Sequence, residues 1–170
     1  MKKVLLFGSV AAVFVMSACK KDNNNNVSSQ DQTFLMQATI SNNAEIMAGN
    51  LAATKGTNAS VKAYGQMMVM EHGMAKSDLQ STVSNTGQSI PADTVDAMHK
   101  ALMTRLSSLS GRAFDTAYIN SQVMDHQMTL ANFNTEISSG SNQNTKDYAN
   151  KYQPHIQMHL KTADSLSHVL

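Results

Sequence analysis

Five polar residues interrupt the apolar stripes of this 170-residue chain, at positions that a helix would turn inward. They are one glutamate and four histidines: Glu45, His72, His126, His155 and His159. Imidazole nitrogens and carboxylate oxygens are ligands for transition metals. His155 and His159 are four residues apart, so on a helix they share one face and both reach toward a single ion. The pattern predicts a metal site built from facing helices.

These five residues also lie at similar depths from the turns that the glycines mark. Glu45 precedes Gly56 by 11 residues and His72 follows it by 16, which at ~1.5 Å per residue is a difference of only ~7 Å. His126 precedes Gly140 by 14 residues, and the last two histidines follow that glycine by 15 and 19. All five residues therefore fall near mid-height of the predicted helices.

The expected ion is copper, zinc or iron, because all three accept imidazole. Methionines surround the histidines in the sequence: Met67, Met68, Met70, Met74, Met124, Met128 and Met158. Thioether with imidazole is a soft set that favours Cu(I). Methionine is also a flexible core filler, and core packing is the role that we expect for most of these residues.

A site without metal stays open as an alternative interpretation. Each buried histidine is then neutral and hydrogen-bonded, with Glu45 accepting from one or two of them. Buried polar networks of this kind occur in proteins that hold no metal. The sequence alone does not decide between the two.

Other polar residues receive no ligand role. Glu71 and Asp125 each precede a histidine, and neighbours on a helix diverge by about 100°, so we expect them to face solvent or form ion pairs. His99 and His168 are assigned no function. The chain has no Gly-rich phosphate loop, no nucleophile elbow and no His-Glu-x-x-His motif.

Composition favours an all-α protein and excludes several classes. Only 15% of residues are charged, and two of the 13 basic residues precede Cys19, leaving a net charge of −1 from there on. The chain therefore has no basic footprint for nucleic acid. A single cysteine excludes an internal disulfide. Two prolines and few β-branched runs argue against β-structure.

Apolar residues at steps of three and four predict five helices, over residues 31–54, 59–84, 94–109, 113–138 and 145–168. Pro154 lies in the last segment, so that helix either kinks there or begins near Gln153. Four long helices with short connections predict an antiparallel four-helix bundle. The short helix is an addition between the second and third long helices.

The first 18 residues are predicted to be a lipoprotein signal peptide. Lys2 and Lys3 precede an apolar run of 12 residues, too short to span a ~30 Å hydrocarbon core. Val-Met-Ser-Ala-Cys at 15–19 resembles a bacterial lipobox, which implies lipid on Cys19 and cleavage before it. Lys20 in the next position favours the outer membrane. Residues 19–30 form the lipidated end and a flexible polar tether.

Residues 31–170 are then the folded domain, and three runs in it resemble domain-of-unknown-function family 4142. They are Met-Val-Met-Glu-His at 68–72, the segment 111–126, and Pro-His with His-Leu at 154–160. The resemblance implies an exported, ferritin-like four-helix domain, often a lipoprotein, and no established activity. In this resemblance, His72, His126 and His159 correspond to the family's recurrent histidines, and Glu45 corresponds to its acidic position in the first helix.

The ferritin-like class also implies di-iron chemistry, but this chain lacks the required Glu-x-x-His motif and has three glutamates in all. Our leading hypothesis is a non-enzymatic, lipid-anchored, periplasm-facing protein of the outer membrane that binds a metal ion through its His/Glu layer. A structural or interaction protein of the envelope is the second hypothesis. A ferritin-like metal oxidoreductase is the third.

Overall fold

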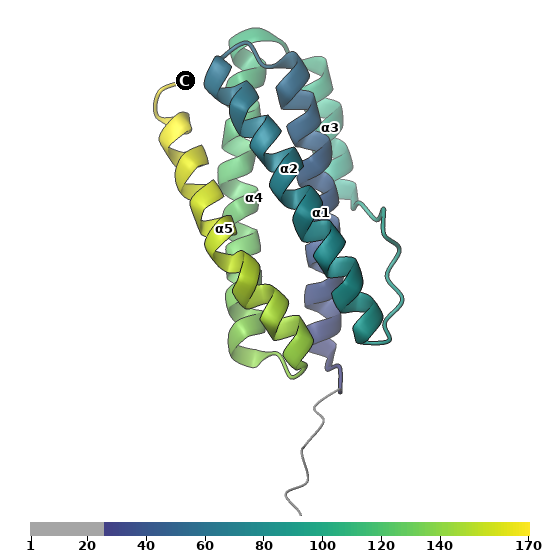
Figure 1. Cartoon of the computed structure of the whole chain (residues 1–170). Coiled ribbons are helices and arrows are strands. Elements are labelled where there is room, and N and C mark those ends of the chain that lie inside the picture. Colours follow the sequence, from purple (N-terminus) through teal and green to yellow (C-terminus); the bar gives the residue numbers. More distant parts are fainter. Residues whose placement is uncertain (1–25) are drawn as a thin grey trace, which may run out of the picture.

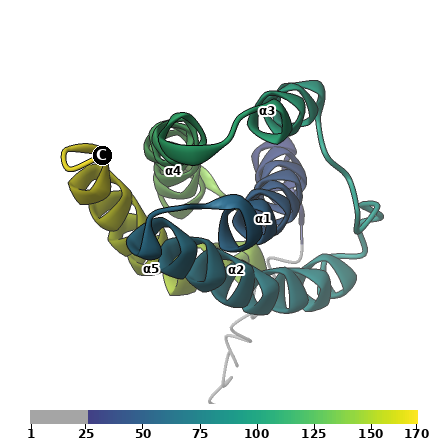
Figure 2. The same ribbon diagram turned by 90° about the horizontal axis from the view of Figure 1, so that it is seen from above.

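The computed structural model describes residues 26–170 and contains five α-helices (Figure 1). They are α1 Ser29–Lys55, α2 Ala59–Asn85, α3 Ala97–Ser108, α4 Gly111–Ser139 and α5 Gln143–Ser167. Seen from above, the four long helices surround a common centre, while the short α3 lies outside them, beside α1 and α4 (Figure 2). The predicted all-α bundle with an extra helix between its second and third long helices is confirmed.

The ends of two helices differ from the prediction. α1 begins at Ser29, because the Ser28 hydroxyl and the Asp31 carboxylate form a capping box. The last residues of the predicted tether therefore belong to the folded domain. α5 runs without interruption from Gln143 through Pro154, which is exposed, so the helix does not start near Gln153.

The signal peptide, Cys19 and most of the predicted tether lie outside the described residues. Within residues 26–170, no helix is both long and apolar enough to span a bilayer.

Two apolar clusters fill the bundle, and a layer of inward-facing histidines from α2, α4 and α5 separates them. One contains Phe34, Leu79, Phe133 and Ile156 at the end of the bundle nearest the start of α1. The other lies at the opposite end and contains, among others, Ala52, Met68, Phe114, Tyr118 and Ala163. On each of α2, α4 and α5 the inward histidine falls between the residues of the two clusters. The apolar core is thus interrupted once, at mid-height.

The methionines do not fill this core. Met68 is fully buried, but seven others expose 42–59% of their surface: Met47, Met70, Met74, Met98, Met124, Met128 and Met158. Of the methionines expected in the core, Met68 and the partly buried Met67 pack there, and the expectation is wrong for the five others: Met70, Met74, Met124, Met128 and Met158. Met70 and Met74 stand two residues either side of His72, and two residues on a helix are about 200° apart. An inward histidine therefore turns both methionines outward.

A pair of carboxyl groups ties the start of α1 to the α4–α5 turn. The Asp31 carboxylate accepts from the backbone N–H groups of Ser141 (2.9 Å) and Asn142 (3.1 Å). Burial alone would raise the pKa of Asp31, but hydrogen bonds from Ser28, Glu136 and Asn142 lower it to about 2. Burial, and then the neighbouring Asp31, raise the pKa of Glu136 to about 7. Glu136 is thus protonated in mildly acidic solution, which removes its repulsion from the Asp31 carboxylate.

This pair predicts a loss of stability as pH rises. Because the pKa of Glu136 is higher in the folded chain than unfolded, its stabilising effect is complete below about pH 4.5 and disappears as pH rises through 7. In Glu136→Gln, the fall in the free energy of unfolding between pH 5 and pH 8.5 should shrink by about 1–2 kcal/mol. Urea unfolding at both pH values measures it. Asp147→Asn, at an exposed site on α5, is the control and should keep the wild-type pH dependence. An unchanged slope in Glu136→Gln would contradict the prediction.

Candidate metal centre

Three histidines from three helices meet at the centre of the bundle. His72 comes from α2, His126 from α4 and His159 from α5, and each is 1–2% exposed. One ring nitrogen of each lies within 4.8 Å of one ring nitrogen of both others. The ring centroids are 5.3–5.6 Å apart. We call these residues the histidine triad.

The other nitrogen of each ring is held by a partner outside the triad. His72 Nδ1 lies 2.9 Å from Asn42 Oδ1, and His126 Nδ1 lies 3.0 Å from the backbone oxygen of Gln122. His159 Nε2 lies 3.0 Å from Glu71 Oε2. A carbonyl or carboxylate oxygen can only accept, so each of these nitrogens carries the ring proton and donates it.

The remaining nitrogens are unpartnered. His72 Nε2, His126 Nε2 and His159 Nδ1 are buried and have no hydrogen-bond partner in residues 26–170. Because the other nitrogen of each ring holds the proton, each of these three nitrogens carries an unshared lone pair. Buried polar atoms in proteins are almost always satisfied, so three such lone pairs in one layer call for an electron-pair acceptor.

Burial keeps the triad neutral. Removal from water lowers the pKa of His72, and the imidazoles of His126 and His159 lower it further. For His126, burial and then His159 lower the pKa to about 3. Burial also lowers the pKa of His159, although its hydrogen bond to Glu71 opposes this. Neutral imidazole is the form that binds metals, so all three rings are ready to act as ligands at pH 7.

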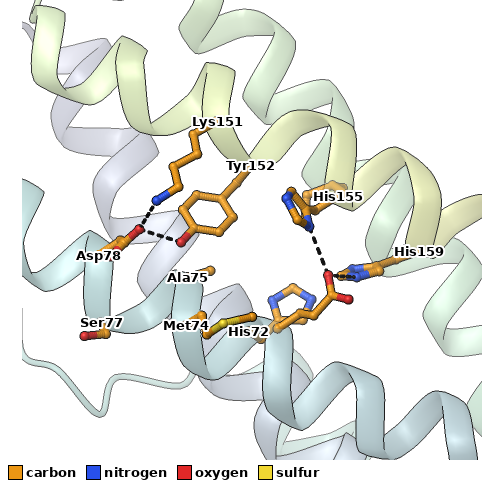
Figure 3. A pocket seen from close by; sticks show the side chains of 11 residues that line it. His72, Met74, Ala75, Ser77, Asp78, Lys151, Tyr152, His155 and His159 are labelled. Atoms are coloured by element: carbon orange, nitrogen blue, oxygen red, sulfur yellow. Dashed lines mark hydrogen bonds and ion pairs between the residues drawn. The ribbon is translucent and has the colours of Figure 1, made fainter.

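A cavity of about 420 Å³ between α2 and α5 reaches the triad. His72 and His159 form part of its wall, with Glu71 and His155 beside them (Figure 3). Its opposite end holds the Asp78 carboxylate, which accepts from Lys151 and from the Tyr152 hydroxyl. Met74 and Ala75 lie between the two ends, and Ile156 also lines the cavity.

Residues 17–166 match the model of a family described as a domain of unknown function, DUF4142. The chain belongs to the DUF4142 family. The predicted resemblance is confirmed. A crystal structure titled as a DUF305 fragment from Deinococcus radiodurans has the same fold, with a TM-score of 0.74, 11% sequence identity, and coverage of 85% of this chain and 99% of that one. No curated protein matches the sequence.

Of the five predicted ligands of this DUF4142 protein, the structure brings His72, His126 and His159 together. Glu45 Oε1 lies 3.6 Å from His126 Nδ1, the nitrogen that already donates to Gln122, and so sits outside the triad. Burial and then the Asp125 charge raise the pKa of Glu45 to about 8. Its Oε2 has no hydrogen-bond partner in the described part of the chain.

His155 is not part of the triad. Its side chain is 46% exposed, and its Nδ1 lies 3.0 Å from Glu71 Oε2, which also contacts His159. Burial would raise the pKa of Glu71, but the hydrogen bonds from His155 and His159 lower it below its ordinary range. Glu71 therefore accepts a hydrogen bond from each ring and bridges an exposed histidine to a buried one.

Sequence reasoning missed three outer partners of the triad. Asn42 precedes Glu45 by three residues and so shares its inward face, a spacing that could have identified it. Glu71 carried no such signal, because its role depends on the packing of α2 against α5. The Gln122 contact is made by a backbone oxygen, which every residue has.

The hydrogen bond from His72 to Asn42 makes a testable prediction about metal affinity. Asn42→Leu removes the acceptor that fixes the tautomer and orientation of His72, and losses of this kind weaken metal binding by about 10–100-fold. Competition titration with a chromogenic chelator and Zn(II) measures the effect. Asn50→Leu is the control, since the exposed Asn50 side chain bonds only to its own helix. Equal affinities for the two variants would contradict the prediction.

Proposed function

We propose that this protein binds one divalent transition-metal ion, of the Zn(II) and Cu(II) class, through His72, His126 and His159. The observation that carries the proposal is the set of three buried, unpartnered ring nitrogens. Each belongs to a ring whose other nitrogen is held by an outer partner. Histidine ligands in metal sites have this arrangement, with one nitrogen on the metal and the other donating to an oxygen.

The donor set supports this choice of metals. Three neutral imidazoles suit zinc and copper, which also stand at the strong end of the divalent affinity series, whereas manganese and magnesium prefer oxygen. A Zn–N bond of about 2.0–2.1 Å in tetrahedral geometry separates the ligand atoms by about 3.3 Å. One ring nitrogen of each histidine already lies within 4.8 Å of one ring nitrogen of both others, so the three rings stand close to the spacing that one ion needs.

Stoichiometry tests the proposal directly. Untagged protein is dialysed against Zn(II) or Cu(II), each offered alone, and the bound metal is measured by mass spectrometry. We expect one ion per chain for either metal. Protein that retains neither ion would overturn the proposal and favour the alternative of a structural envelope protein with a polar core.

We also propose that the protein is anchored to the outer membrane through lipid on Cys19 and faces the periplasm. Two sequence features support this proposal. A lipobox-like run at 15–19 ends in the single cysteine, and it follows two lysines and a short apolar segment that are typical of a signal peptide. Wild type grown with labelled palmitate should incorporate the label and sediment with outer membranes. Cys19→Ser should lose both properties, while Ser28→Ala keeps them. Unlabelled wild-type protein would overturn the anchoring proposal.

A further inference from the structure

The cavity between α2 and α5 has a carboxylate at each of its two ends, and both carboxylates come from α2. Glu71 and Asp78 are seven residues apart, so they share one face of the helix at a separation of two turns, or ~10.5 Å along its axis. Ala75 lies between them on the same face and has a small side chain, which leaves space beside the helix.

Each carboxylate is held in the same way by two side chains of α5. Glu71 Oε2 accepts from both histidines of that helix, each at 3.0 Å. Asp78 Oδ2 accepts from Lys151 and from the Tyr152 hydroxyl (Figure 3). The second oxygens, Glu71 Oε1 and Asp78 Oδ1, accept no hydrogen bond from residues 26–170. One oxygen at each end of the cavity is therefore left for a ligand.

Both carboxylates are charged at pH 7. Hydrogen bonds from Lys151 and Tyr152 lower the pKa of Asp78. Burial raises the pKa of Glu71, but hydrogen bonds from the two histidines of α5 outweigh it and lower that pKa. The Lys151 side chain is 63% exposed, and exposed ion pairs of this kind are weak, so its ammonium can move aside for another.

The part of the cavity between the two carboxylates is apolar. Met74 and Ala75 lie there, and Ile156 also lines the cavity (Figure 3). Pockets for small molecules combine apolar walls with a few polar groups that fix the orientation of the ligand. An ammonium group forms a strong, charge-assisted hydrogen bond with a carboxylate. A ligand with a hydrocarbon centre and an ammonium at each end matches this sequence of surfaces.

We propose that the α2–α5 cavity binds an aliphatic diamine, with one ammonium on Glu71 Oε1 and the other on Asp78 Oδ1. Hydrogen bonds of ~2.8 Å at each end place the two nitrogens ~5–10 Å apart, a range that includes the extended chain of 1,5-diaminopentane. The site goes beyond the proposed metal binding and does not depend on it, because it uses no nitrogen of the histidine triad.

The probe is 1,5-diaminopentane, and 1-aminopentane, which has the same chain and one ammonium, is the matched ligand control. Untagged protein is stripped of metal with EDTA and desalted, so that no amine can coordinate an ion, and is titrated with each amine by calorimetry at pH 7.5 and low ionic strength. We expect one diamine per chain, bound at least tenfold more tightly than the monoamine. No saturable diamine binding, or equal affinity for the two amines, would rule out the inference and leave the proposed metal binding untouched.

Variants of the two carboxylates test the location. Asp78→Asn, at a side chain that is 44% exposed, should stay folded and lose the preference for the diamine, because one end of the cavity is no longer charged. Glu71→Gln should have the same effect from the other end, with circular dichroism as the check on folding. Asp93→Asn is the control, since Asp93 also pairs with a lysine, Lys76, but does not line this cavity. Wild-type diamine affinity in Asp78→Asn, or an equal loss in Asp93→Asn, would contradict the assignment.

Discussion

The variant His126→Ala should lose stoichiometric metal binding, with affinity for Zn(II) or Cu(II) at least about 100-fold below wild type. Loss of an outer partner already weakens metal sites by 10–100-fold, and His126 would be a direct ligand. The ring contributes one of the three unpartnered nitrogens, so its removal leaves two ligands from α2 and α5. Isothermal titration calorimetry on untagged, metal-free protein measures the change.

The matched control for this variant is His155→Ala. His155 was also predicted to be a ligand from its spacing to His159, yet its half-exposed side chain contacts Glu71 and not the triad. Its removal should lower affinity by no more than tenfold, through the altered hydrogen bonding of Glu71. Circular dichroism and thermal unfolding establish that both variants are folded. Equal losses in the two variants, or wild-type affinity in His126→Ala, would reject the triad as the site.

A second large effect is expected from a substitution at Gly65 of α2, where α1 and α2 cross closely. A Cβ on Gly65 would lie 2.7 Å from the backbone oxygen of Gly49, 2.8 Å from Ala52 Cβ and 3.0 Å from Ala53 N. Backbone atoms cannot swing aside, so Gly65→Ala forces the helices apart. We expect the free energy of unfolding to fall by about 2–3 kcal/mol, as in other overpacked cores. At this size, that lowers Tm by roughly 4–12 °C.

Gly73→Ala should instead raise the free energy of unfolding. A Cβ there would meet nothing within 4 Å, outside the helix's own nearby backbone, so the substitution removes only the entropic cost of glycine within a helix. A gain of about 0.5–1 kcal/mol is expected. Thermal and urea unfolding of the metal-free proteins compare the two variants. If Gly65→Ala were as stable as Gly73→Ala, the close α1–α2 approach would be wrong.

This approach matters for the site as well as for stability. Gly49 and Gly65 allow α1 to lie against α2, and the Asn42 side chain of α1 thereby reaches His72. A wider spacing would lengthen that hydrogen bond. Gly65→Ala should therefore also weaken metal binding, by the mechanism expected for Asn42→Leu.

Much of the fold was determined by the sequence alone. The steps of three and four between apolar residues identify each helix, because 3.6 residues per turn place these positions on one face. The same period turns His72, His126 and His159 inward, and it turns the methionines two residues away outward, although we expected them in the core. Helix boundaries are less predictable, as the start of α1 shows, because a capping box places it two residues before the predicted start.

Only the tertiary structure decided which of the inward-facing groups meet. Helical period fixes the face of a residue, but not the stagger between helices, the side-chain rotamer or the nitrogen that each ring presents. For this reason Glu45 and His155, at suitable depths in the sequence, lie outside the triad, and Asn42 and Glu71 hold its outer nitrogens. The cavity beside the triad arises between α2 and α5, which are distant in the chain and adjacent only after folding.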